Sequence, residues 1–313
     1  MYIKLILLML FSLCFIACDD NSQNNLKNKI QGNTMSAPFI IKAGMSSQEY
    51  NQRNSTFINK KIDKQPAGLN FYEQSWSVSE YGLVQVEHSD KSFRIPFVLS
   101  STGIEDTEFS ERGIDEFTVQ ASITGNEFIE HEQARTQFMK MIQDIIALGW
   151  QPYHEFHSDP RLMGKQSFQY AIKDGSYSPD PMYMPGLDEW MALEAGRSWA
   201  LYHGDVFLNV SFRRNRKFMD KDGPGVYLLT FKLMTRDALA RDYFEGSERE
   251  QWKNLWSESI KKYKVMRYQE EVELIKQGYH INTQYLDPQI HTNDPVEPDD
   301  VDDLLDFIKQ YNN

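Results

Sequence analysis

The sequence predicts an α+β fold in which antiparallel and mixed sheets pack against a few long amphipathic helices. Three observations carry this prediction: a polar turn separates two β-like segments at 81–88 and 93–99, a helical period runs through 130–148, and two alternating segments occupy 205–213 and 226–233. Strands, a helix and then further strands are typical of an α+β domain rather than a doubly wound one. The 313 residues are 41% apolar and 13% aromatic, which is enough to fill a core.

The first seventeen residues have the pattern of a secretory signal peptide. Lys4 lies in a short basic start, and an apolar run follows from Leu5 to Phe11. The apolar stretch is well short of the roughly 20 residues that a membrane-spanning helix needs. We therefore expect residues 1–17 to direct export and then to be removed.

Cys18 is the predicted lipid attachment site. Phe15-Ile16-Ala17-Cys18 resembles the lipobox of bacterial lipoproteins, which implies that the Cys18 thiol is diacylated and becomes the mature N-terminus, although Phe15 stands where Leu is usual. Cys14 and Cys18 are the two cysteines of the chain, so neither serves a disulfide in the folded part. The alternative is a plain signal peptide that is cut nearby.

The residues after Cys18 predict a location and a tether. Asp19 resembles the signal that retains a lipoprotein on the inner membrane, which favours the periplasmic face of that membrane, with the outer membrane as the alternative. Residues 18–45 are rich in Asn, Gln, Ser and Lys and poor in apolar residues, so we expect a flexible tether. The globular region is predicted at 46–286, either as one unit or as a mainly β part at 46–125 followed by an α+β part at 126–286.

The first half of the globular region reads mainly as β structure. The segments at 81–88 and 93–99 predict a hairpin, in which Pro96 indicates an edge strand or a bulge. A third strand is expected at 117–123. Apolar residues at helical spacing then predict a helix from Glu130 to Leu148, which Gly149 ends.

The second half alternates short helices with strands. We expect a short helix at 165–172, a proline-rich loop, and a helix from Leu187 to about Trp199 that Gly196 interrupts. The segments at 205–213 and 226–233 predict an antiparallel pair joined by a long loop.

Helical sequence returns near the C-terminus. It covers about 238–278 and ends at Gly278, with these positions expected to be buried: Tyr243, Trp252, Leu255, Trp256, Ile260 and Tyr263. Residues 287–313 form an acidic, proline-containing tail with a short amphipathic helix at 301–308 that docks back or meets a partner.

The sequence contains no complete catalytic or cofactor motif. The patterns G-x-S-x-G, G-x-G-x-x-G and G-x-x-x-x-G-K-[ST] are missing, so we expect no catalytic residue and no cofactor. His154 and His157 have the wrong spacing for a zincin, and Asp220-Lys-Asp-Gly223 is a turn sequence that lacks the later ligands of a calcium loop. No metal site is predicted, while a pair of carboxylates brought together in space stays open.

One aromatic and acidic segment is the candidate contact surface for a protein partner. Aromatic residues are enriched at binding hot spots, and core packing is the alternative explanation for them. The candidate residues are Tyr177, Tyr183, Trp190, Asp180, Asp188 and Glu189. The formal net charge of −12 repels nucleic acid and favours a basic partner, although solubility alone also explains it.

Several segments together resemble a family of periplasmic lipoproteins of Gram-negative bacteria associated with type VI secretion gene clusters. The resemblance extends from about Gly82 to Pro298 and rests on G-I-E-D-T-E-F (103–109), A-L-G-W-Q-P-Y (147–153), S-D-P-R-L-M-G-K (158–165), Y-S-P-D-P-M-Y-M-P-G-L-D-E-W-M (177–191), G-D-V-F-L-N-V-S-F (204–212) and G-V-Y-L-L-T-F (225–231). It implies an immunity protein that binds and occludes a phospholipase or cell-wall toxin, and it brings no catalytic residue.

Two other functions stay open at this point. An envelope scaffold lipoprotein would bind a housekeeping partner instead of a toxin. A hydrolase acting on lipid or cell wall would be favoured by a deep pocket containing convergent carboxylates or His154.

Overall fold

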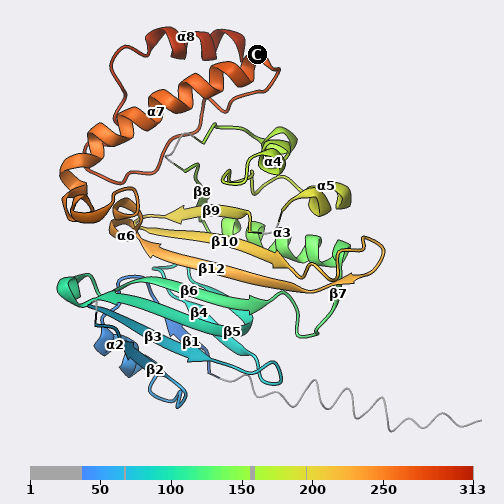
Figure 1. The fold of residues 1–313 in the computed structure, drawn as a ribbon, viewed down its shortest axis with the longest axis vertical. Coiled ribbons are helices and arrows are strands. Elements are labelled where there is room, and N and C mark those ends of the chain that lie inside the picture. Colours follow the sequence, from blue (N-terminus) through green and yellow to red (C-terminus); the bar gives the residue numbers. More distant parts are fainter. Residues whose placement is uncertain (1–36, 67, 156–158, 195, 313) are drawn as a thin grey trace, which may run out of the picture. The chain divides into compact units, whose positions relative to one another are not determined.

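The computed structural model describes residues 37–66, 68–155, 159–194 and 196–312, and the predicted signal peptide and Cys18 lie outside them. Figure 1 shows helices and strands combined around a large mixed sheet, which confirms the α+β prediction. The strands are β1 (Phe39–Ile41), β2 (Lys61–Lys64), β3 (Leu69–Ser75), β4 (Gly82–Val86), β5 (Phe93–Asp106), β6 (Ile114–Ser122), β7 (Ile129–Glu130), β8 (Gln151–Pro152), β9 (Ser198–His203), β10 (Val206–Arg214), β11 (Pro224–Gly225) and β12 (Tyr227–Thr235).

The helices flank this sheet and account for the rest of the regular structure. They are α2 (Ser47–Arg53), α3 (His131–Ala147), α4 (Gly164–Lys173), α5 (Leu187–Ala192), α6 (Arg236–Arg241), α7 (Trp252–Lys276) and α8 (Asp302–Tyr311), with 3-10 turns η1 (Thr107–Arg112) and η2 (Gly246–Gln251). In the described residues the main sheet has the order β1-β4-β5-β6-β12-β10-β9-β8, with β3 also beside β5 and β2 beside β3.

The predicted hairpin is present as β4 and β5. The two strands pair antiparallel, and their register shifts between Gly82 and Val84, opposite Pro96 and Phe97. Phe97 has φ +55°, so the backbone turns out of the ladder at this point. Pro96 therefore lies at a bulge opposite β4. β5 as a whole lies between β4 and β6, but its ladder with β6 begins only at Val98, so at Pro96 the other side of the strand is unpaired among the described residues.

The fold begins before residue 46, which corrects the expected extent of the tether. β1 pairs in parallel with β4, and its outer residues Phe39 and Ile41 are fully buried. Met45 is buried as well. Because these apolar residues complete the core beside α2, residues 39–45 belong to the folded unit.

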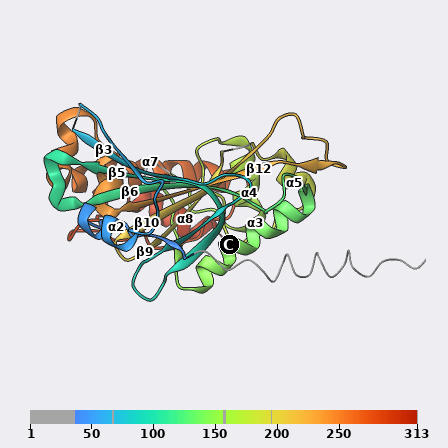
Figure 2. The same cartoon turned by 90° about the horizontal axis from the view of Figure 1, so that it is seen from below.

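The predicted amphipathic helix at 130–148 is α3. Its residues Phe138, Ile142 and Ile145 are buried, and the Phe138 ring lies edge-on to Phe212 of β10, 5.3 Å between ring centroids. Gly149 follows with φ +111°, a backbone conformation that favours glycine and ends the helix. This helix covers one face of strands β9, β10 and β12 (Figure 2).

The helix predicted from Leu187 to Trp199 ends early, at Ala192. Residues Ser198–His203 form β9, an antiparallel neighbour of β10, and Trp199 is buried in the core. The Arg214 side chain donates to the backbone oxygens of Trp190 and Met191 and so satisfies the end of α5. Long-range pairing with β10 thus overrides the local helical pattern.

β10 and β12 form the predicted antiparallel pair, and β12 joins the two halves of the chain. Nine residue pairs run from Val206 with Thr235 to Arg214 with Tyr227. On its other edge β12 pairs with β6 over seven positions, from Leu228 with Ser122 to Met234 with Glu116 (Figure 1). The chain from Pro38 onward is therefore one compact unit and not two subdomains.

The helical region expected at 238–278 is divided into α6, η2 and α7. Trp252, Trp256 and Ile260 of α7 pack with Phe207 and Met234 on the sheet face opposite α3. Gly278 ends the region with φ +88°. In the described part of the chain no helix is both long enough and apolar enough to cross a membrane.

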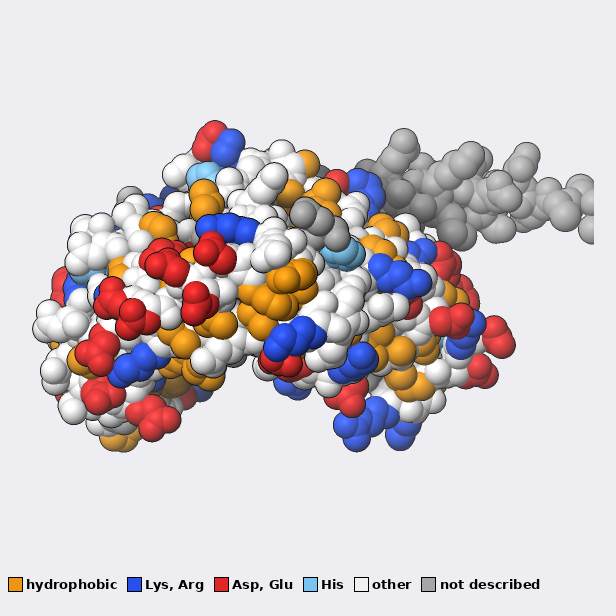
Figure 3. Space-filling view, turned by 90° about the horizontal axis from the view of Figure 1, so that it is seen from above, with side chains coloured by type: hydrophobic (Ala, Val, Ile, Leu, Met, Phe, Trp, Pro, Cys, Tyr) orange, Lys and Arg blue, Asp and Glu red, His pale blue; other side chains and the backbone are white. Residues whose placement is uncertain are grey.

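The acidic tail packs on α7 because its charged groups find partners there. Asp287 accepts two hydrogen bonds from buried Arg267, at 2.8 and 3.0 Å, and Glu297 accepts one from buried Lys264 at 2.7 Å. Ile308 of α8 is buried. The tail therefore docks on its own chain, and Figure 3 shows acidic side chains gathered on the face above α7 and α8.

Candidate functional site

Two of the six predicted contact residues are part of the core. The Tyr177 side chain is 1% exposed and the Trp190 side chain 0% exposed. Trp190 stacks on Phe212, with ring centroids 4.2 Å apart, and donates its indole N–H to Tyr227. Core packing, the alternative explanation, accounts for both residues, so neither can touch a partner in this structure.

The other four predicted contact residues shape the loop around α5. Asp180 accepts from the backbone N–H groups of Gly164 and Met182, at 2.7 and 2.9 Å. Glu189 accepts from Gly186 N–H and from the Tyr183 hydroxyl, at 2.9 and 2.8 Å. Asp188 is exposed and pairs with Lys221. The carboxylates of Asp180 and Glu189 are thus already used in local structure.

Two short motifs considered above as metal ligands, around His154 and around Asp220, show no metal-binding geometry in the residues that the structure describes. No group of three or more His, Cys, Asp and Glu within the described ranges has the geometry of a metal centre. His157 lies outside those ranges, and the side chain of His154 packs against Tyr177 and Tyr285. Gly223 N–H donates to the Asp220 backbone oxygen at 3.1 Å, which is the geometry of a turn.

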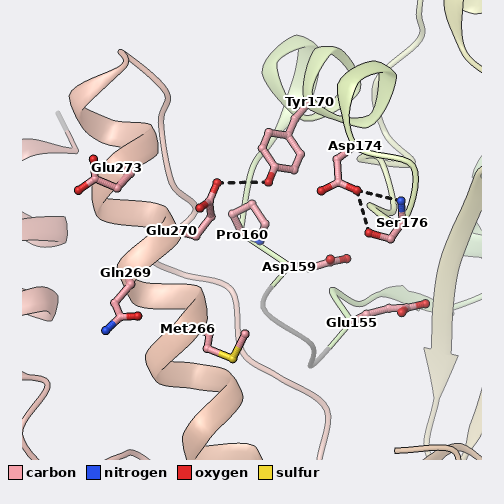
Figure 4. Close-up of a pocket in the computed structure, with 10 residues that line it drawn as sticks. All are labelled: Glu155, Asp159, Pro160, Tyr170, Asp174, Ser176, Met266, Gln269, Glu270 and Glu273. Atoms are coloured by element: carbon pink, nitrogen blue, oxygen red, sulfur yellow. Dashed lines mark hydrogen bonds between the residues drawn. The ribbon is translucent and has the colours of Figure 1, made fainter.

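The main candidate site is a cavity of about 670 Å³ beside α7, which we call the acidic cavity. A cavity of this volume lies within the range that small ligands use. Ten residues line it: Glu155, Asp159, Pro160, Tyr170, Asp174, Ser176, Met266, Gln269, Glu270 and Glu273 (Figure 4). Five of these are carboxylates, and none of the described lining residues is basic, so the lining is acidic.

One wall of the acidic cavity is a single face of α7. Met266, Gln269, Glu270 and Glu273 have the spacing that places side chains on one side of a helix. Glu270 accepts a hydrogen bond from the Tyr170 hydroxyl at 3.3 Å, and Glu273 pairs with Lys276 at 2.6 Å. The Tyr170 hydroxyl carries no charge, so this hydrogen bond does not neutralise the carboxylate of Glu270.

The opposite wall comes from the segment that leads into α4 and from the end of that helix. Asp174 accepts from the backbone N–H and the hydroxyl of Ser176, at 2.9 and 2.8 Å. Asp159 is 9% exposed, and one of its carboxylate oxygens, Oδ2, has no hydrogen-bond partner among the described residues. In Figure 4 the Asp159 carboxylate points into the space between Glu155, Asp174 and Ser176.

Burial sets the protonation of the two innermost carboxyl groups. Burial, reinforced by the charge of Glu155, raises the pKa of Asp159 to about 7, although Arg267 opposes the shift. Burial also raises the pKa of Glu155 above its ordinary value. Asp159 therefore exchanges its proton with water near neutral pH, and a cation placed beside the two groups would favour their charged forms.

The basic side chains nearest to the cavity are occupied elsewhere. Arg161 binds Glu271 through its guanidinium at 2.8 and 2.6 Å. Arg197 donates to the backbone oxygens of Ala171 and Gly175, and Arg267 is held by Asp287. These three cations hold the walls of the cavity, and of them Arg267 also acts on the charge of Asp159.

The sequence reasoning left open a carboxylate pair but did not find this site. Glu155 and Asp159 precede Glu270 and Glu273 by more than a hundred positions, and the fold alone brings the two segments together. The one local signal was the spacing of Met266, Glu270 and Glu273 on a single helix face.

Comparison of the chain with models of protein families, with characterised proteins and with solved structures finds no match.

Proposed function

We propose that the chain is a lipid-anchored binding protein of the cell envelope, an immunity protein that occludes a toxin. The observation that supports this proposal best is the acidic cavity, which has five carboxylates and no basic residue among its described lining residues. Such a surface attracts a basic segment of a partner protein and repels phosphate backbones. In this proposal Cys18 holds the protein at the periplasmic face of a membrane, where a secreted toxin against lipid or cell wall acts.

Inhibition by occlusion needs binding and no chemistry. A stable complex buries a total of about 1,600 Å² and draws most of its affinity from a few anchoring residues near the centre of the interface. The acidic cavity is the proposed anchor point, and the exposed acidic residues of the surrounding face steer the basic partner toward it.

The test combines capture with protection. The chain from Met35 onward serves as bait for the products of neighbouring genes, and any captured protein is then directed to the periplasm of cells that carry the full-length chain. Capture of a toxic protein and restored growth would support the proposal. Replacing Cys18 by Ser should release the protein from the membrane fraction and weaken protection.

Failure to capture any neighbouring product, together with unchanged killing, would contradict inhibition of a toxin. Capture of a harmless envelope protein would favour the scaffold function instead. In both the capture assay and the growth assay, the full-length chain with Glu258→Gln serves as the control. This residue is exposed on α7 and does not line the cavity, so the substitution should leave capture and protection unchanged.

A second candidate function, hydrolysis of cell wall or lipid, is favoured by one observation. Asp159, with a pKa of about 7, lies in the same cavity as Glu155, and glycoside hydrolysis uses one protonated and one charged carboxyl group. Turnover of purified cell wall or phospholipid vesicles by the chain alone, lost in Asp159→Asn, would establish it. If the chain turns over neither substrate, hydrolysis is excluded as its function.

A further inference from the structure

We propose that the acidic cavity is a binding site for an organic cation, an ammonium or guanidinium group on an aliphatic stem. The inference concerns the cavity itself and rests on the proposed function only for the origin of the cation. That origin is either a Lys or Arg side chain of a partner protein or a free diamine or guanidine compound.

An unpartnered buried oxygen marks the place of the charged group. A buried polar atom without a hydrogen bond costs free energy, and a buried carboxylate without a countercharge costs more. Asp159 Oδ2 is such an atom: it is buried and has no hydrogen-bond partner among the described residues. Asp159 belongs to the cavity lining, where Asp174 and Ser176 offer further oxygens. A group with several N–H donors would satisfy these acceptors together.

The lining also fits the stem of such a ligand. Pro160 and the thioether of Met266 supply apolar surface, and the Tyr170 ring lies between the two walls (Figure 4). Long cationic side chains bury their methylene groups on apolar surface, and a guanidinium stacks on aromatic rings. The mixed lining thus matches a ligand that is charged at its end and apolar along its length.

A metal ion does not fit the same carboxylates. Metal ions need several ligand atoms at about 2.0–2.6 Å from one point. The described carboxylates of the cavity do not converge on such a point. A larger cation, which spreads its charge over several N–H groups, reaches carboxylates that are further apart.

The experiment titrates the chain from Met35 onward, alone, with three probes: agmatine, 1,5-diaminopentane and the methylamide of Nα-acetylarginine. Isothermal titration calorimetry at pH 8 measures the dissociation constants. We expect saturable binding at 1:1 stoichiometry, weakened about 10-fold or more by Asp159→Asn and by Glu155→Gln. Glu258→Gln removes one charge from the same helix outside the cavity and should leave the constant unchanged.

The controls separate this inference from other outcomes. No saturable binding of any probe at about 10 mM would overturn it, and so would binding by both cavity variants that is as tight as binding by the unchanged chain. Mg²⁺ that binds as tightly as the organic probes and competes with them would overturn it as well. Circular dichroism checks the fold, and if Asp159→Asn is unfolded, Glu155→Gln and Glu270→Gln decide the result.

The probes also distinguish the two sources of the cation. Tighter binding of the amide-flanked arginine than of the free compounds assigns the site to a side chain of a protein, and the reverse order assigns it to a small molecule. Capture of a toxic partner without binding of any probe would refute the cation site and leave the proposed function standing. Probe binding without any captured partner would support the cation site and contradict the proposed function.

Discussion

The guanidinium of Arg161 and the carboxylate of Glu271 form a two-pronged ion pair, with bonds of 2.8 and 2.6 Å, and Glu271 is completely buried. The backbone N–H of Arg161 adds a third bond to the same carboxylate at 2.9 Å. Arg161 follows Asp159 and Pro160 directly, and Glu271 follows Glu270. This pair therefore fastens the two walls of the acidic cavity to each other.

Removing one partner of this pair should destabilise the protein strongly. Glu271→Gln leaves the Arg161 charge without a counterion in a buried place, which costs about 3–5 kcal/mol in free energy of unfolding. Urea denaturation at pH 7 measures this value. The exposed pair of Lys140 and Asp144 is the control, because Asp144→Asn should cost at most about 0.5 kcal/mol. Equal, small effects of both substitutions would show that the buried pair does not hold the walls.

Asp159 should make the fold less stable as the pH rises. Its pKa is 3.8 in an unfolded chain and about 7 in the fold, so the folded state binds the proton more tightly. Stability is unaffected by this group below pH 4, decreases from pH 4 to 7, and stays reduced above pH 7. Asp159→Asn should therefore gain about 1–3 kcal/mol at pH 8 and show a flatter pH dependence. Loss of stability in the variant at pH 8 would mean that the carboxylate is paired.

Asp174, in the same cavity, should behave in the opposite way. Burial alone would raise its pKa, but hydrogen bonds from Ser176 outweigh burial and lower it. A carboxyl group with a lowered pKa stabilises the fold above its unfolded pKa and loses that contribution as the pH falls through the acid range. Asp174→Asn should reduce the melting temperature at pH 7 and have little effect at pH 3. An unchanged melting temperature at pH 7 would contradict this.

Binding of an organic cation should tighten as the pH rises from 6 to 8. The charged and titratable groups that influence Asp159 are Glu155 beside it, Arg267 of α7, and the hydroxyls of Tyr170 and Tyr177, which stay protonated in this range. The cation favours the deprotonated forms of Asp159 and Glu155, so binding releases protons. Calorimetry in buffers of different ionisation enthalpy measures the number released. Proton uptake, or affinity independent of pH, would count against this arrangement.

Trp190 should matter for stability and not for partner contact. Trp190→Ala empties a fully buried space beside Phe212 and Tyr227, and such truncations cost about 3–5 kcal/mol. Its exposed neighbour is the control, since Asp188→Asn should change the free energy of unfolding by less than about 0.5 kcal/mol. Thermal denaturation of the two variants gives the comparison. A stable, well-folded Trp190→Ala protein would contradict the core assignment.

Elements with a strong local pattern were predictable from the sequence. The apolar spacing of α3, its terminal Gly149 and the alternation of β10 and β12 are present near the expected bounds. The hairpin of β4 and β5 is present too, but β5 runs past its expected end at Leu99 to Asp106. β9 was missed, because Trp199 and its neighbours are compatible with a helix locally and become a strand only by pairing with β10. Tertiary pairing often overrides such weak propensities.

The candidate site was less predictable than the fold. Tyr177 and Trp190 have the composition of a contact surface, and composition alone does not distinguish a contact surface from a core. The acidic cavity forms where α7 docks against the segment around Asp159. A pattern within either segment cannot predict that the two segments come together. The buried Lys264 and Arg267 were also unexpected, since their counterions Glu297 and Asp287 come from the tail.

The pairing of β6 with β12 has a consequence for how the chain reaches its native state. More than a hundred residues separate the two strands, so the sheet cannot close until Thr235 has left the ribosome. Contacts this distant in sequence favour slow folding. A fragment cut after residue 125 would carry β6 as an open edge, and the complementary fragment would carry β12 in the same state. Each half alone is expected to aggregate through that edge, whereas the two halves produced together can complement each other.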